Sequence, residues 1–269
     1  MNAILRLTCR DCRGIVAAVT NFITRNNGNI VNLDQYTDPA AGQFFMRLEW
    51  DLAGFKLPRS RISAALQKFG KIAVSFSDQK KRAAIFVSKY DHCLYDLLLR
   101  SKSGELNCDI TAVISNHEDL RYVAETFGQE FYCLPDNEKK QLALLKAKKA
   151  DLLILARYMQ ILSPKFIRAY PHKIINVHHS FLPAFKGAKP YHQAYQRGVK
   201  IIGATAHFAT EDLDQGPIIQ QNVAQISHRD TVEDLITRGR DLERQVLSEA
   251  VRYFLNDRLF VCGQRTIIL

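Results

Sequence analysis

Polar side chains suited to acyl chemistry are concentrated between Asn176 and Pro217. Asn176 and His178 stand two residues apart beside β-branched apolar residues, so on a strand both side chains point to the same side. An amide beside an imidazole suits an oxyanion, because the amide N–H stabilises developing charge while the imidazole donates or relays a proton. Asp214 lies in Leu-Asp-Gln-Gly-Pro, which predicts a fixed turn, and its carboxylate can orient the imidazole or take a proton from an attacking water. The sequence therefore predicts reaction at a carbonyl carbon, with Asn176, His178 and Asp214 as catalytic residues.

Two other kinds of site fit this stretch less well. A metal could be held by His178, His179, His207 and Asp214, but the chain has no His-x-x-x-His, Cys–His cluster or His-Glu-x-x-His, so we expect none. Ser180 could be a nucleophile beside His179, but adjacent strand residues point to opposite sides and no Gly-x-Ser-x-Gly elbow is present.

Alternating strands and helices must position these residues. Short apolar runs predict strands at 83–88, 110–114, 131–134, 152–155, 173–177, 201–208 and 218–226, with helices between most of them and a long last helix from about 230. This alternation predicts a Rossmann-like α/β domain with a mostly parallel sheet, and we expect the last helix to be structural. No Gly-x-Gly-x-x-Gly motif or P-loop is present, so a nicotinamide cofactor or nucleoside triphosphate is not predicted.

The first part of the chain has a different pattern. Strands are predicted at 2–9, 29–36, 43–50 and 71–76, and helices after Gly14 and at 58–69, which gives the order βαββαβ. The polar run 77–82 indicates a boundary. We therefore predict a first domain at 1–78, a linker at 79–83 and a second domain at 84–269.

Composition restricts the partners and the compartment. The net charge of +10 is spread along the chain without a stacking motif, so no nucleic acid is expected. The six cysteines form no dense framework and are expected to be reduced thiols. No apolar run approaches the roughly 20 residues that span a bilayer, so we expect a cytoplasmic protein without a membrane partner.

The first domain resembles the ACT domain, a ferredoxin-like regulatory module. The resemblance rests on residues 11–16 (Asp-Cys-Arg-Gly-Ile-Val), residues 28–30 (Gly-Asn-Ile) and the βαββαβ order, although Arg10 stands where that family usually has proline. It implies a homo-oligomer, either a dimer or a tetramer, with an amino-acid effector such as glycine or methionine. The implied effector contacts are Asp11, Gly14, Asn29 and Ile30. The alternative is that the glycines and Asn29 serve only backbone geometry.

Residues 83–260 resemble the formyltransferase family that uses 10-formyltetrahydrofolate. Four motifs carry the resemblance: Asn-x-His-x-Ser-x-Leu-Pro from 176, Met-x-Ile-Leu-Ser from 159, Gly-Ala-Thr-x-His-Phe from 203 and Leu-Asp-x-Gly-Pro from 213. It implies that Asn176, His178 and Asp214 are catalytic, and that the folate is a substrate, with no other cofactor. The implied substrate contacts are Met159, Gln160, Leu162, His207, Thr210 and Glu211.

The remaining features bear on the acceptor of the formyl group. The preceding ACT-like domain, the loop Pro190 to Tyr195, and His179, where the family's glycinamide ribonucleotide enzymes usually have proline, resemble members that use water. This resemblance implies a hydrolase that converts 10-formyltetrahydrofolate to formate and tetrahydrofolate, supplying formate for purine synthesis and balancing the one-carbon pool. Two alternatives stay open: transfer to an amine such as glycinamide ribonucleotide, and a non-catalytic folate or amino-acid sensor.

Overall fold

The computed structural model describes residues 1–184 and 190–269, which divide into two compact units. The first unit comprises residues 1–80, 256–262 and 267–269, and the second comprises residues 81–255 and 263–266. The units therefore differ from the expected ranges, because most of the last 14 residues group with the first unit. In addition, strand β5 (Lys81–Val87) begins inside the expected linker at 79–83.

The first unit has the predicted βαββαβ order. Its elements are β1 (Asn2–Arg10), α1 (Ile15–Arg25), β2 (Asn29–Asp38), β3 (Gln43–Asp51), α2 (Arg59–Leu66), a 3-10 turn (Gln67–Phe69) and β4 (Lys71–Phe76). The strands are hydrogen-bonded in the order β2-β3-β1-β4, and every neighbouring pair is antiparallel. This small antiparallel sheet fits an ACT-like domain and confirms the predicted fold class.

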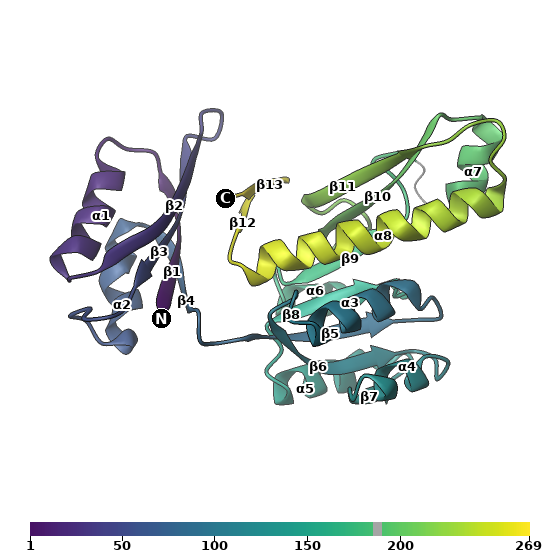
Figure 1. The fold of residues 1–269 in the computed structure, drawn as a ribbon, viewed down its shortest axis with the longest axis horizontal. Coiled ribbons are helices and arrows are strands. Elements are labelled where there is room, and N and C mark those ends of the chain that lie inside the picture. The colour runs from purple at the N-terminus through teal and green to yellow at the C-terminus, as the bar shows by residue number, and fades with distance from the viewer. Residues whose placement is uncertain (185–189) are drawn as a thin grey trace. The chain divides into compact units, whose positions relative to one another are not determined.

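Helices α1 and α2 cover one face of this sheet (Figure 1). Side chains alternate between the two faces of a strand, so Phe44, Met46 and Leu48 of β3 share one side. These three residues share a buried core with Val19 and Ile23 of α1. Burial of this apolar face holds the two helices on the sheet.

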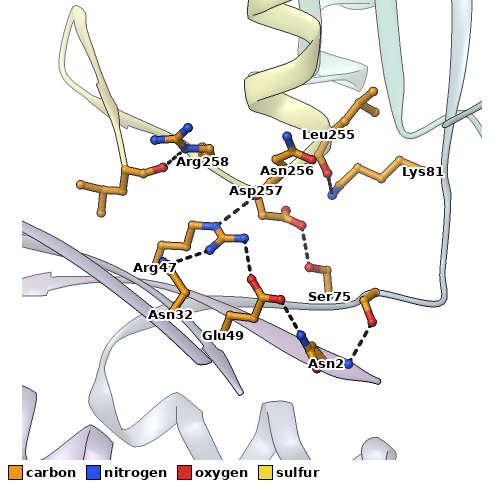
Figure 2. Close-up of polar contacts among 12 residues, drawn as sticks. Asn2, Asn32, Arg47, Glu49, Ser75, Lys81, Leu255, Asn256, Asp257 and Arg258 are labelled. Atoms are coloured by element: carbon orange, nitrogen blue, oxygen red, sulfur yellow. Dashed lines mark hydrogen bonds and ion pairs between the residues drawn. The ribbon is translucent and has the colours of Figure 1, made fainter. Parts of the chain in front are cut away.

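Residues 256–262 cover the other face of the same sheet. Phe45 of β3 contacts Phe260 of β12 (Leu259–Cys262) edge to face, with ring centroids 5.7 Å apart. Arg47 Nε donates to the Asn256 carbonyl at 3.1 Å, and Ser75 Oγ donates to Asp257 Oδ2 at 2.6 Å (Figure 2). The sheet of the first unit is therefore covered on both faces.

The second unit is the predicted α/β domain. Its elements are β5, α3 (His92–Lys102), β6 (Cys108–Ser115), α4 (Arg121–Thr126), β7 (Phe131–Cys133), α5 (Glu138–Ala147), β8 (Leu152–Ala156), α6 (Pro164–Ala169), β9 (Ile174–His178), α7 (Pro190–Arg197), β10 (Ile201–Phe208), β11 (Ile218–Gln225) and α8 (Val232–Leu255). The strands run in the order β11-β10-β9-β8-β5-β6-β7. Pairing is parallel from β9 to β7 and antiparallel at β10 and β11, which confirms a mostly parallel sheet.

Helices and loops complete this unit. Ala84 and Phe86 of β5 share a core with Leu145 of α5 and Phe166 of α6. The long helix α8 packs along β9, β10 and β11 and also contacts α3 (Figure 1). At the carboxyl end, Arg265 of β13 (Arg265–Ile268) pairs in parallel with Ile218 of β11.

All six cysteines lie in the described part of the chain, and all are free thiols. No helix among the described residues is long and apolar enough to cross a membrane.

Candidate active site

The pairing of β9 with β10 places three polar side chains on one face of the sheet. Asn176 lies directly opposite His207, and His178 lies opposite Thr205. Paired residues share a face, as do residues two apart on one strand, so Asn176, His178 and His207 project to the same side. His178 is the last residue of β9, one position beyond the expected end of this strand.

Asp214 reaches these residues from the loop between β10 and β11. A Cβ on Gly216 would lie 1.7 Å from the Phe208 carbonyl oxygen, so only glycine lets this loop turn so closely against the end of β10. The backbone of Asp214 has φ 55°, in the left-handed region that is unfavourable for residues other than glycine. The predicted fixed turn is present, and it holds the carboxylate in place.

The buried His178 and the partly buried Asp214 form a pair. Nδ1 of His178 lies 3.2 Å from Oδ2 of Asp214, and the two side chains are 7% and 14% exposed. Burial opposes ionisation of Asp214, but the hydrogen bond from His178, together with the neighbouring His207 ring, outweighs it and holds the pKa of this carboxyl below its usual range. Nε2 of His178 is buried, and no described residue hydrogen-bonds it. The carboxylate thus orients the imidazole and leaves Nε2 for a ligand.

His207 connects Asn176 to the same carboxylate. Its Nδ1 lies 2.9 Å from the Phe208 carbonyl oxygen, which can only accept, so Nδ1 carries a proton. Nε2 lies 3.2 Å from Asn176 Nδ2 and 3.5 Å from Asp214 Oδ1. In the neutral tautomer, Nε2 accepts one N–H of the Asn176 amide, and the second N–H remains for a ligand. His207 was expected to contact substrate, yet its ring nitrogens contact both predicted catalytic neighbours.

A cavity of about 600 Å³ opens over this constellation, a volume typical of small-molecule sites. Its lining includes all three predicted catalytic residues. It also includes every predicted substrate contact, namely Met159, Gln160, Leu162, His207, Thr210 and Glu211. Three exposed apolar side chains of the lining, Met159, Ile161 and Leu213, offer a surface on which a flat aromatic ligand can lie.

The segment that follows β8 is held at both ends. The Met159 N–H donates to Ser88 Oγ at 2.9 Å, and the Ser163 N–H donates to Glu138 Oε1 at 2.6 Å. The loop after β10 is anchored in part by an ion pair of 2.9 Å between Arg168 and Glu211. These bonds give the wall formed by both loops a fixed shape.

Sequence reasoning missed a buried carboxylate on α8, the helix expected to be structural only. Glu243 is 1% exposed and lines the cavity. Its Oε1 accepts from Tyr191 Oη at 2.8 Å, and its Oε2 lies 2.8 Å from His92 Nε2 and 3.4 Å from Arg157 Nε. Burial opposes ionisation, but the His92 hydrogen bond and the Arg157 charge keep the pKa of Glu243 below its usual range. The sequence did contain a sign that Glu243 is buried, because this residue interrupts the apolar stripe of α8 beside Leu242.

His92, Cys93 and Glu243 are the described residues whose ligand atoms could together hold a metal ion, within 4.8 Å of one another. Two observations weigh against a cation there. Burial raises the pKa of the Cys93 thiol well above its usual value, so this sulfur stays protonated. The carboxylate is already shared by His92 and the positive charge of Arg157.

The four expected effector contacts do not come together within one chain. Asp11 and Gly14 follow β1, whereas Asn29 and Ile30 begin β2. Both strands run antiparallel to β3, and the register places the end of β1 and the start of β2 at opposite ends of β3. At about 3.3 Å per residue these ends are about 26 Å apart. A site that uses all four residues therefore needs a second copy of the chain.

Some known proteins resemble part of this chain, and others resemble all of it. Residues 81–251 match the model of the formyl transferase family. A formyltetrahydrofolate deformylase from Synechocystis is 50% identical, covering 100% of this chain and 98% of the relative. The crystal structure of a formyltetrahydrofolate deformylase from Pseudomonas syringae is 43% identical with a TM-score of 0.96, covering 100% of this chain and 94% of that one. A glycinamide ribonucleotide transformylase from Symbiobacterium toebii is 31% identical with a TM-score of 0.69, covering 72% of this chain and 96% of its own.

The extent of the likeness distinguishes these two kinds of relative. The transformylase matches less than three quarters of this chain, whereas the deformylases match it along its whole length. The chain therefore belongs to the formyl transferase family and, within it, to the formyltetrahydrofolate deformylases.

Proposed function

We propose that this protein hydrolyses 10-formyltetrahydrofolate to formate and tetrahydrofolate. The observation that carries this proposal is the full-length likeness to formyltetrahydrofolate deformylases, which includes the ACT-like unit. The catalytic arrangement also suits the reaction, because an amide, an imidazole and a carboxylate converge on one cavity. Transfer to an amine such as glycinamide ribonucleotide is not favoured, since the likeness to a transformylase is limited to part of the chain.

The proposed catalytic roles follow from the hydrogen-bonding groups that His178 and Asn176 leave for a ligand. Asp214 holds Nδ1 of His178, so Nε2 faces the substrate, and a protonated imidazole there is stabilised by the carboxylate. The oxygen of a water forms a bond to the formyl carbon, and the electron pair of the carbonyl π bond moves to its oxygen. The second N–H of Asn176 and the Nε2–H of His178 stabilise the resulting oxyanion.

Collapse of this intermediate breaks the bond between the formyl carbon and N10. The proton lost by the attacking water reaches N10 through Asp214 or a second water, so the products are formate and tetrahydrofolate. N10 is attached to an aryl ring and is weakly basic, which makes its expulsion easier than that of an alkyl amine. The backbone of residues 159–162 and the loop at 209–214 are proposed to hold the folate.

The ACT-like unit is proposed to bind an amino-acid effector, glycine or methionine, in a dimer or tetramer. Asp11 and Gly14 lie at one end of β3, and Asn29 and Ile30 lie at the other. This separation supports the proposal, because two copies of the chain must combine to bring all four residues together. Calorimetric titration with each amino acid, combined with light scattering to determine the oligomeric state, tests it. A monomer, or a protein that binds neither compound, contradicts it. The cytoplasmic location stays a prediction.

The activity is tested by incubating the purified protein with 10-formyltetrahydrofolate and no acceptor. We expect formate and tetrahydrofolate to appear in equal amounts at a catalytic rate. The Asn176→Ala variant should lose about 10²-fold to 10³-fold in kcat, because one oxyanion donor is removed. Dependence on an added amine would indicate a transferase, and tight binding without turnover would indicate a sensor.

A further inference from the structure

A second group of cavity side chains joins the catalytic residues through His179. The ring centroid of His179 lies 5.2 Å from that of His178 and 6.0 Å from that of Tyr191. His179 lines the cavity, and in the described part of the chain no residue hydrogen-bonds its ring nitrogens. Its polar edge is therefore available to a small molecule beside the catalytic imidazole.

Tyr191 is fixed behind this ring. It is 7% exposed, and its hydroxyl donates to Glu243 at 2.8 Å. Burial and the Glu243 carboxylate raise the pKa of Tyr191, so the phenol keeps the proton that it donates. A Cβ on Gly239 would lie 2.1 Å from the Tyr191 hydroxyl oxygen, so the ring lies directly against the backbone of α8.

The carboxylate that holds Tyr191 is itself held from two further elements. His92 at the start of α3 and Arg157 after β8 both approach Oε2 of Glu243. Arg157 has φ 62°, and its guanidinium lies over the Tyr90 ring, 4.9 Å from the centroid. Four elements thus converge on one buried group, which gives the wall behind His179 a fixed position.

The neutral charge state of the His179 imidazole suits contact with a neutral molecule. Burial and the Arg157 charge lower the pKa of His179 to about 3, so the ring is neutral at physiological pH. A neutral imidazole offers one N–H donor and one acceptor lone pair. A water that donates to this lone pair keeps its own oxygen lone pairs free to attack. The neutral ring also offers a protonated amine no negative charge with which to pair.

We propose that His179 holds the attacking water beside His178, and that the Tyr191–Glu243 contact fixes His179 so that water rather than an amine accepts the formyl group. This inference rests on the proposed hydrolysis. In this proposal His179 binds the reacting water, and Tyr191 and Glu243 position the His179 ring.

The test compares His179→Ala and His179→Gln with the wild type in 10-formyltetrahydrofolate plus a large excess of glycinamide. The formyl group is traced to formate or to formylglycinamide. His179→Ala should lose about tenfold or more in kcat, equivalent to one hydrogen bond, with the folate KM changed less than about threefold. The share of formylglycinamide should rise above that of the wild type. His179→Gln keeps a donor and an acceptor, so it should recover most of the hydrolysis.

Two further variants keep the test decisive. The exposed His228, outside the cavity lining, supplies the matched control His228→Ala, which should behave as wild type. If His179→Ala does not fold, Tyr191→Phe removes the fixing hydrogen bond but keeps the ring, and it should raise the formylglycinamide share to a smaller extent.

The inference is overturned if folded His179→Ala keeps wild-type kcat, or if both it and Tyr191→Phe leave the division between formate and formylglycinamide unchanged. Failure of the proposed function has a different signature, because the wild type itself would then release no formate without an amine.

Discussion

Nδ1 of His178 lies 3.2 Å from Oδ2 of Asp214, and Nε2 of the same ring is buried with no hydrogen-bond partner among the described residues. The other carboxylate oxygen lies 3.5 Å from Nε2 of His207, which in turn contacts the Asn176 amide. One carboxylate therefore orients the His178 imidazole directly and also lies in contact with the His207 imidazole that accepts from the Asn176 amide. Its loss should disturb both oxyanion donors together.

Asp214→Asn tests this coupling. The amide keeps the shape of the side chain but removes the charge that stabilises a protonated His178. We expect kcat to fall by about 10²-fold to 10⁴-fold, with a smaller change in folate KM, because the lost interactions matter most in the transition state. Steady-state kinetics of formate release measures both constants. A kcat within threefold of wild type would remove Asp214 from the mechanism.

His179 provides a pH-dependent contribution to stability. In the unfolded chain this ring takes up a proton near pH 6.5, whereas in the folded protein it stays neutral down to about pH 3. Between these values the unfolded state binds more protons, so the free energy of unfolding falls as the pH falls. From pH 6.5 to pH 5 the wild type should lose about 2 kcal/mol that His179→Gln does not lose.

Urea unfolding of both proteins at a series of pH values measures this difference. The other titratable groups are common to both proteins, and Glu243 and Asp214, which act on the His179 ring, are ionised in both throughout this pH range. Parallel pH dependence of the two proteins would mean that His179 protonates normally in the folded state.

Much of this site could be predicted from the sequence because its signals are local. Asn176 and His178 stand two apart on one strand, so their common direction follows from strand geometry alone. Asp214 is marked by its Gly-Pro turn, and the structure adds the reason, a glycine pressed against the Phe208 carbonyl. The order of strands and helices was also readable, because apolar periodicity changes where one type of element replaces the other.

Other features depend on contacts between distant segments, and a local pattern does not reveal what those contacts do. The role of Glu243 requires α3, α7, α8 and the end of β8 to meet, and a lone glutamate in an amphipathic helix is usually a surface residue. The strand β12 is four residues long, and its burial depends on Phe45 in β3. The distance between the end of β1 and the start of β2, where the expected effector contacts lie, follows from strand register, which the sequence pattern does not specify here.

Gly239 and Tyr191 allow a double-mutant cycle on the wall behind His179. Gly239→Ala would place a methyl group against the hydroxyl end of the Tyr191 side chain, and the overpacking should cost about 1 to 3 kcal/mol of unfolding free energy despite the better helix propensity of alanine. In the Tyr191→Ala background the clash is absent, so the same substitution should be neutral or stabilising. Chemical denaturation of the four proteins gives the coupling energy, and simple additivity would contradict the contact.

Phe260 tests the covering of the first unit by the end of the chain. Its edge-to-face contact with Phe45 belongs to a small core with Cys262 and Leu269. Phe260→Ala should lower the free energy of unfolding by about 3 kcal/mol and speed amide hydrogen exchange in β3. Val31→Ala, at a residue of the same sheet that is 57% exposed and has no partner residue on β3, is the control with little expected change. Unchanged exchange in β3 would mean that residues 256–262 leave this face readily.

Water as the acceptor is tested most directly by isotope labelling. The purified protein is given 10-formyltetrahydrofolate in ¹⁸O-enriched water without an amine, and the formate is analysed by mass spectrometry at early times. Attack of water on the formyl carbon predicts one solvent-derived oxygen in each formate, with tetrahydrofolate formed in equal amount. Formate that carries no solvent oxygen, or no formate until an amine is added, would contradict hydrolysis by this protein.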